Sequence, residues 1–229
     1  IKESIRVANA IQKYVIDNTR LGIPAFFSEE CPHGHEALEA TTFPTNIGVG
    51  STWNPELYER MCAVIRKELR ARGGHLALIS SLDITTDPRW GRTEECYSED
   101  PYLSGTFCER AVWGIQGHSE EQLPENAIAV LKHFCAQGAT RATNIGQREL
   151  HEIHLKGMRK GIKAGALGCM AAYNDIDGVP CHINKKLLTD ILRNEMGFQG
   201  FVMSDGKAVD RLKAITGSFE KAGAKAIQA

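Results

Sequence analysis

The chain has 229 residues, 42% of them hydrophobic, with 27 basic and 28 acidic side chains and a formal net charge of −1. A chain of this size can bury a sizeable core as one domain, and its composition excludes the collagen-like and low-complexity classes. The balanced charge gives no electrostatic reason to expect a nucleic acid or an anionic membrane as partner. No apolar run approaches the ~20 residues of a membrane span, and the first residues lack a signal-peptide core.

The seven cysteines are an odd number, and no C-x-x-C pair occurs among them. This pattern argues against a disulfide framework and against a structural zinc site. No cluster of ligand residues calls for another metal, and no sequence motif calls for a cofactor, so we expect neither. Free cysteines favour a reducing compartment, and we predict a cytoplasmic location.

Helices are predicted between short apolar runs, beginning with an amphipathic helix at residues 1–14. Asn54 and Asp100, each followed by a proline, predict helices over 55–72 and 101–117. In both cases a side-chain oxygen can cap free amides, and proline fits the first helical position. Asn184 predicts a further helix over 185–196. Glycines at the ends of these helices act as C-terminal caps, at positions 73–74, 117 and 197.

Continuous apolar runs predict strands that are buried on both faces, which is the pattern of a parallel sheet. The five runs cover residues 23–27, 75–82, 127–134, 169–174 and 200–205. Each run ends in charged or hydrogen-bonding side chains, as strands of a (β/α)8 barrel do at their carboxyl ends. The G-x-G-x-x-G pattern of a dinucleotide-binding sheet is missing after the first run. We therefore predict an α/β fold of the (β/α)8, TIM-barrel-like type.

A complete barrel has eight strands in ~250 residues, whereas the sequence predicts five. We therefore expect residues 1–229 to form a single, incomplete barrel domain of a longer protein.

Asp205 is the most sharply placed candidate for chemistry, because it follows a predicted buried strand and precedes Gly206. A carboxylate at the mouth of a barrel can act as a base, a metal ligand or a glycosyl nucleophile. The alternative is a structural role, in which Asp205 caps the helix that follows it.

Other candidates end the third predicted strand or lie in polar loops. Lys132 and His133 emerge from a buried strand, so Lys132 could bind a polar substrate, form a Schiff base or pair with an acid. Arg92 could hold a substrate by forked hydrogen bonds, or pair with acids of its own loop. Glu30 lies in the segment 28–35, which is suited to hydrogen-bonding a polyol or to bracing its own loop.

Five segments, taken together and in this order, resemble glycoside hydrolase family 3, a family of exo-acting β-glycosidases. They are SEECPHGH, DPRWGRTEECYSEDP, LKHF, MAAYNDIDGVPC and GFVMSDG. The resemblance spans residues 23 to about 213. It implies a catalytic barrel domain and, as substrate, a small saccharide or β-glycoside.

The resemblance also implies a role for each matching residue. Asp205 matches the carboxylate nucleophile that forms a glycosyl-enzyme intermediate. Lys132, His133 and Arg92 match residues that bind the sugar in subsite −1. Tyr173 matches the tyrosine near the nucleophile, and Arg141 matches an arginine after the Lys-His pair. Glu30 stands where many members have an aspartate that binds the far hydroxyls of the sugar.

Two departures qualify this comparison. Gly206 stands where many members have a tryptophan, so an aromatic wall of the subsite must come from elsewhere. In the larger members the general acid/base lies in a second α/β domain, which would follow residue 229. We therefore expect a second domain or a partner chain to supply that carboxylate.

These observations predict a retaining exo-β-glycosidase that acts on terminal β-D-glucosyl residues through a covalent glycosyl-Asp intermediate. A β-xylosidase of the same family is the nearest alternative. A Schiff-base aldolase that uses Lys132 and a sugar-binding module without catalysis are the other two.

Overall fold

The computed structural model describes residues 2–138 and 142–229. Its centre is a parallel sheet whose five strands have the order β1-β2-β3-β5-β8. The strands are Ser28–Glu30, Leu76–Ser81, Ile128–Phe134, Gly168–Ala171 and Phe201–Ser204. Their register runs from Ser28 opposite Leu76 at one edge to Gly168 opposite Phe201 at the other. A small second sheet joins β4 (Ala142–Thr143), β6 (Asp175–Ile176) and β7 (Val179–Pro180).

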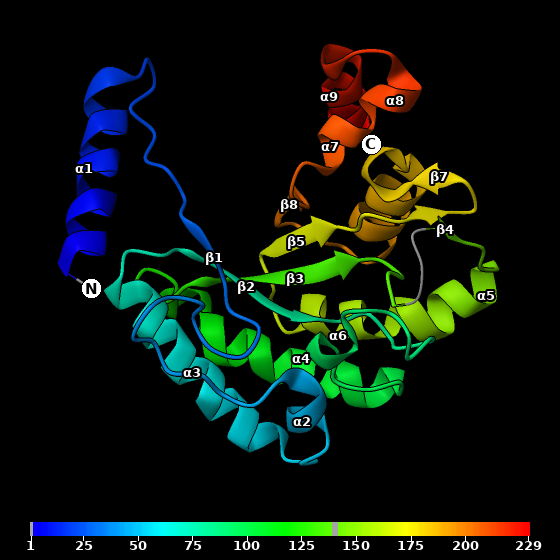
Figure 1. Ribbon diagram of the computed structural model, residues 1–229, viewed down its shortest axis with the longest axis horizontal. Coiled ribbons are helices and arrows are strands. Elements are labelled where there is room, and N and C mark those ends of the chain that lie inside the picture. The colour runs from blue at the N-terminus through cyan, green and yellow to red at the C-terminus, as the bar shows by residue number, and fades with distance from the viewer. Residues whose placement is uncertain (1, 139–141) are drawn as a thin grey trace.

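Helices connect the parallel strands, and α3, α4 and α6 lie together along one face of the sheet (Figure 1). The α-helices are α1 Lys2–Asn18, α2 Asn46–Gly50, α3 Pro55–Ala71, α4 Pro101–Gln116, α5 Gln147–Glu149, α6 Lys156–Lys163, α7 Ala208–Arg211, α8 Lys213–Thr216 and α9 Phe219–Gln228. Short 3-10 helices are η1 Thr93–Glu95, η2 Glu120–Gln122 and η4 Cys181–Ile183; η3 Leu150–His154 and η5 Lys186–Glu195 are π-helical. In the described part of the chain, no helix is long and apolar enough to cross a membrane.

The predicted helix starts are confirmed by capping hydrogen bonds. The Asn54 side chain accepts from the Leu57 amide at 3.0 Å, and Asp100 accepts from the Tyr102 amide at 2.8 Å. Asn184 accepts from the Leu187 amide at 3.1 Å at the start of η5. Gly117 ends α4 with a φ of 89°, a conformation that glycine adopts without steric cost.

The prediction of a first strand at residues 23–27 is wrong. Ile23 and Phe26 are 63% and 66% exposed, and the strand β1 begins only at Ser28. The Phe27 carbonyl accepts from the amides of His75 and Leu76, so this apolar run leads into the ladder instead of forming it.

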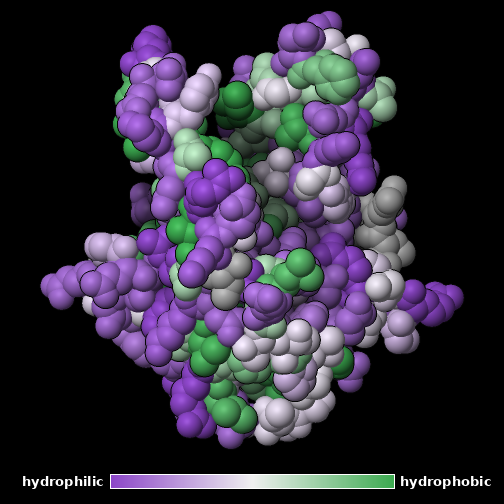
Figure 2. All heavy atoms as spheres, turned by 60° about the vertical axis from the view of Figure 1, so that its left-hand side comes forward, coloured by the Kyte–Doolittle hydropathy of each residue, from purple (hydrophilic) through white to green (hydrophobic). Residues whose placement is uncertain are grey.

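Side chains of the central strands alternate between two apolar layers. Ala77, Ile79 and Leu131 join the main core against the helices. Leu78, Val130 and Met170 form a smaller cluster on the opposite face. Figure 2 shows a hollow with apolar atoms in it, between the part that carries α1 and the part that carries the C-terminal helices. A parallel sheet with helices on one face and an apolar opposite face is the arrangement of a TIM-like barrel sector.

All seven cysteines are buried. Burial raises the pKa of Cys62 and Cys169 to about 12, which keeps these thiols protonated and unreactive.

Candidate active site

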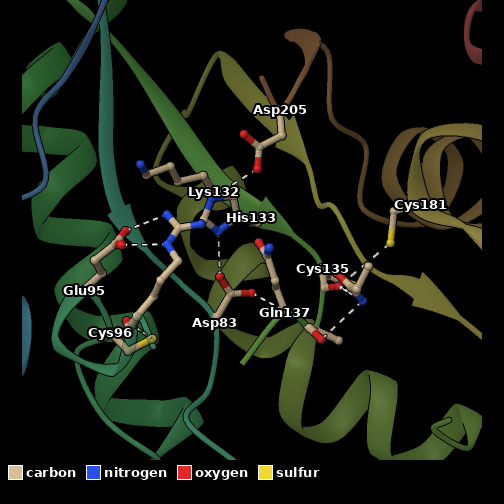
Figure 3. Close-up of polar contacts among 12 residues, drawn as sticks. Asp83, Glu95, Cys96, Lys132, His133, Cys135, Gln137, Cys181 and Asp205 are labelled. Atoms are coloured by element: carbon tan, nitrogen blue, oxygen red, sulfur yellow. Dashed lines mark hydrogen bonds and ion pairs between the residues drawn. The ribbon is translucent and has the colours of Figure 1, made fainter. Parts of the chain in front are cut away.

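The polar residues that follow the parallel strands meet at the carboxyl ends of these strands. Glu30 ends β1, Asp83 follows β2, Lys132 and His133 lie near the end of β3, and Asp205 follows β8. Because the strands are parallel, their carboxyl ends lie on the same side of the sheet. Figure 3 shows the side chains of Asp83, Lys132, His133 and Asp205 around one centre.

Asp205 presents one carboxylate oxygen to this centre. Its Oδ1 accepts a hydrogen bond from the Gly206 amide at 2.7 Å, and its own amide donates to His182 Nε2 at 3.3 Å. Oδ2 is buried and finds no hydrogen-bond partner among the described residues. His133 Nε2 lies 3.6 Å from Oδ2, which is outside hydrogen-bond range. This oxygen therefore keeps its lone pairs available.

His133 is held from behind by a buried acid. Its Nδ1 lies 2.8 Å from Asp83 Oδ2, and the side chains are 1% and 0% exposed, respectively. The other oxygen of Asp83 accepts from the Gln137 amide at 2.9 Å. The ring is thus fixed with Nε2 directed at Asp205.

Lys132 and Glu30 form an ion pair across the mouth of the site. Lys132 Nζ lies 2.6 Å from Glu30 Oε2. The lysine side chain is almost fully buried, whereas that of Glu30 is 44% exposed. The site therefore contains a buried cation whose partner carboxylate still faces solvent.

Arg92 and Glu95, which follow β2 in the chain, form a forked pair. Arg92 Nε and one terminal nitrogen donate to the two Glu95 oxygens at 2.6 and 2.7 Å. Hydrogen bonding to Glu95 holds the pKa of Arg92 above its usual range, and the charges of Asp83 and Asp205 add to this. Burial alone would raise the pKa of Glu95, but the Arg92 guanidinium outweighs it and lowers that pKa. Trp90, which packs beside Arg92, is 5.9 Å from the guanidinium carbon.

Tyr173 closes the turn that carries Asp205. Its hydroxyl donates to the Gly206 carbonyl, and the Arg211 guanidinium lies over its ring at 4.3 Å. Burial and the nearby charge of Asp205 raise the pKa of Tyr173, so the phenol remains a hydrogen-bond donor at neutral pH.

The structure brings together six of the seven site residues expected from the sequence: Glu30, Arg92, Lys132, His133, Tyr173 and Asp205. The seventh, Arg141, lies outside the described residues. Three partners in the site were not predicted as such: Asp83, Glu95 and His182. The position of Asp83 after a predicted strand could have identified it, whereas no sequence pattern pointed to His182.

Within residues 2–138 and 142–229, no group of three or more His, Cys, Asp or Glu side chains is arranged to hold a metal ion. Three acids of the site, Glu30, Asp83 and Glu95, are instead engaged with Lys132, His133 and Arg92, respectively.

A parallel sheet that gathers carboxylates and cations at the carboxyl ends of its strands is typical of barrel enzymes. Residues 2–229 match the family described as "Glycosyl hydrolase family 3 N terminal domain". The chain therefore belongs to this family, as the resemblance of its segments predicted.

Individual relatives agree with this assignment. A β-xylosidase of Formosa agariphila is 38% identical over 212 residues, which cover 86% of this chain and 29% of the relative. The structure of a β-glucosidase of Erythrobacter marinus matches with a TM-score of 0.95 and 35% identity, over 99% of this chain and 31% of that one. A β-glucosidase of Listeria innocua in complex with isofagomine matches with a TM-score of 0.89 and 32% identity, over 97% and 32% of the two chains. The chain thus spans less than a third of the length of these proteins.

Proposed function

We propose that this chain is the sugar-binding and nucleophile-bearing domain of a retaining exo-β-glycosidase that acts on terminal non-reducing β-D-glucosyl residues. Family membership supports the reaction class. The observation that carries the proposal is the carboxylate of Asp205, whose buried Oδ2 has no hydrogen-bond partner in the described structure and lies 3.6 Å from His133 Nε2.

In the first step, a lone pair of Asp205 Oδ2 forms a bond to the anomeric carbon as the bond to the leaving oxygen breaks. The Gly206 amide holds Oδ1, so the two oxygens have different tasks. The leaving oxygen takes a proton from a general acid. In the second step, water attacks the same carbon, that acid now removes the proton of the water, and Oδ2 leaves as a carboxylate.

The general acid comes from a second domain or a partner chain in this proposal. Retaining hydrolysis needs two carboxyl groups ~5–5.5 Å apart. Two other acids of the described site already have partners, since Asp83 binds His133 and Glu95 binds Arg92. A carboxyl group from outside this chain completes the pair.

The remaining side chains bind the sugar hydroxyls. Lys132, His133 and Arg92 are donors, and Glu30 is a half-exposed acceptor at the mouth. Sugar hydroxyls both donate and accept hydrogen bonds, so such a mixed set suits them. Tyr173 holds the turn at Gly206 and thereby the direction of Asp205.

Glu30 bears on the choice between glucosides and xylosides. A β-xyloside lacks the hydroxymethyl group of a β-glucoside. Glu30 is one methylene longer than the aspartate that many family members have at this position, and a longer side chain there would favour the smaller sugar. The similarity to the β-xylosidase of Formosa agariphila supports β-xylosides as the second candidate substrate. The ion pair of Lys132 with Glu30 does not favour a Schiff-base aldolase, because that lysine is engaged as a hydrogen-bond donor.

The test uses the full-length protein and aryl β-glucosides and β-xylosides. NMR of the sugar released first should show the β-anomer, since two displacements at one carbon restore its configuration. Release of the α-anomer first, or hydrolysis of neither substrate, would contradict the proposal. Asp205→Asn serves as the matched control and should hydrolyse neither substrate.

A further inference from the structure

We infer that Asp83 is a positioning residue, which fixes the His133 ring so that its Nε2 faces the reacting oxygen of Asp205. The inference rests on the function proposed above, because it gives Asp205 Oδ2 its task. It concerns a residue that touches neither the sugar nor the reacting carbon.

The first observation is the environment of the Asp83 carboxylate. Its side chain is fully buried, and a buried carboxylate is costly unless its oxygens find donors. Oδ1 accepts from the backbone amide of Gln137, and Oδ2 lies 2.8 Å from His133 Nδ1. Asp83 therefore ties the end of β2 to the segment that follows β3, and one oxygen is committed to the histidine.

The second observation is the direction of the His133 ring. A ring nitrogen that faces a carboxylate at 2.8 Å must carry a hydrogen, so Nδ1 is the donor to Asp83. Nε2 then points at Asp205 Oδ2 from 3.6 Å. Asp83 thus decides which nitrogen faces the site: it holds the hydrogen of Nδ1 and leaves Nε2 as the nitrogen presented to the reacting oxygen.

This orientation matters in the second half of the reaction. While the glycosyl ester exists, Oδ2 carries no charge. When the ester breaks, the electron pair of the C–O bond returns to Oδ2, and the charge develops beside a ring that Asp83 already holds in place. The orientation of His133 is set before the reaction, so no reorientation is needed at that moment.

A purely structural role for Asp83 makes a different prediction, and Asp83→Asn separates the two. Asparagine has the same shape and retains one oxygen for the Gln137 amide. It replaces the oxygen that faces His133 Nδ1 by an NH2 group, which donates where an acceptor is needed. The backbone tie thus persists in this variant, while the hydrogen bond to the histidine is reversed.

The experiment is a double-mutant cycle in the full-length protein with Asp83→Asn, His133→Gln and both together. Asp83→Asn should lower kcat by about 100-fold, as removal of a carboxylate behind a functional histidine commonly does, with a smaller change in KM. In the His133→Gln background the same substitution should cost less than about 3-fold, because its target is already gone. Equal losses in both backgrounds would overturn the inference. Asp87→Asn, on the same loop but paired with the exposed Arg89, is the matched control and should leave kcat unchanged.

A second measurement does not depend on turnover. In 15N-histidine-labelled full-length protein, His133 should show an exchange-protected Nδ1 proton that Asp83→Asn removes and Asp87→Asn retains. Persistence of this proton in Asp83→Asn would overturn the positioning role. A wild-type protein that shows the proton but hydrolyses no glycoside would instead contradict the proposed function, so the two failures are distinguishable.

Discussion

Lys132 Nζ lies 2.6 Å from Glu30 Oε2, although 102 residues separate the two in the chain. They come from β3 and β1, which are not neighbours, since β2 lies between them. The pair therefore spans the mouth of the site across β2. Its two ends differ in burial, and this difference decides what each substitution does.

Glu30→Gln should destabilise the protein, because it leaves the buried ammonium of Lys132 without a carboxylate. We expect the free energy of unfolding to fall by about 1–2 kcal/mol, less than for a fully buried pair because Glu30 is half exposed. Denaturant unfolding measures this loss. Glu29→Gln, at the neighbouring exposed acid, is the control, and an equal effect of the two variants would contradict the interpretation.

Glu30→Asp should change the choice of sugar. Shortening the side chain by one methylene leaves more room at the mouth, so the ratio of kcat/KM for β-glucosides over β-xylosides should rise, by about 10-fold for a group of this size. Parallel assays of matched aryl glycosides in the full-length protein test this. A ratio that stays the same or falls would contradict a role of Glu30 in selecting the sugar.

Glu95 should make stability depend on pH in the acid range. Its pKa is lowered in the folded state from an ordinary value of 4.5, against the effect of burial, by the Arg92 guanidinium. The stabilisation is therefore complete above pH 4.5 and is lost as the pH falls through the lower folded pKa. Glu95→Gln removes this contribution.

The measurement is the difference in Tm between wild type and Glu95→Gln as a function of pH. It should be largest near neutral pH and shrink below pH 4.5. Glu94→Gln, at the adjacent exposed acid, supplies the control curve. A difference in Tm that grows on acidification would contradict a stabilising role of the ionised Glu95 carboxylate.

The free energy of unfolding should fall as the pH drops below 6.5, in part because of His182. Burial lowers the pKa of His182 from 6.5, and the neutral ring accepts the Asp205 amide. Between the lowered pKa and 6.5 the unfolded chain binds a proton that the folded chain does not, so stability decreases on acidification.

His182→Gln retains an acceptor but does not titrate. Its free energy of unfolding should therefore depend less on pH between about pH 8 and pH 5 than that of wild type. Other histidines also contribute to the wild-type slope, since burial lowers the pKa of His35, His75 and His154. Only the difference between the two proteins tests His182, and identical slopes would contradict its assignment.

Local signals in the sequence were enough for most of the fold. Asn54 and Asp100 each precede a proline, and both cap helices as predicted. The run 23–27 failed as a strand because hydrophobicity alone does not say where ladder hydrogen bonds begin. The Phe27 carbonyl accepts from the amides of His75 and Leu76, and the β1 ladder begins with Ser28 opposite Leu76. That pairing depends on a segment about 50 residues away.

The site was predictable in its members and not in its pairs. Asp205, Lys132 and His133 follow apolar runs, and parallel strands bring such residues to one edge. That His133 would face Asp83, or that His182 would reach the Asp205 amide, depends on register and on the return path of loops. Arg141 lies outside the described residues, so its role stays a prediction, as does the nucleophilic role of Asp205.

The most direct test of the account is peptide mass spectrometry of the full-length protein after treatment with an activated 2-deoxy-2-fluoro-β-glucoside and with its xyloside counterpart. The fluorine slows breakdown of the glycosyl-enzyme, while the good leaving group maintains its formation, so the intermediate accumulates. We predict a one-sugar adduct on Asp205, which Asp205→Asn abolishes together with activity, by about 10⁴-fold or more. An adduct on another residue, or hydrolysis by a protein that neither reagent labels, would contradict the assignment of Asp205 as the nucleophile.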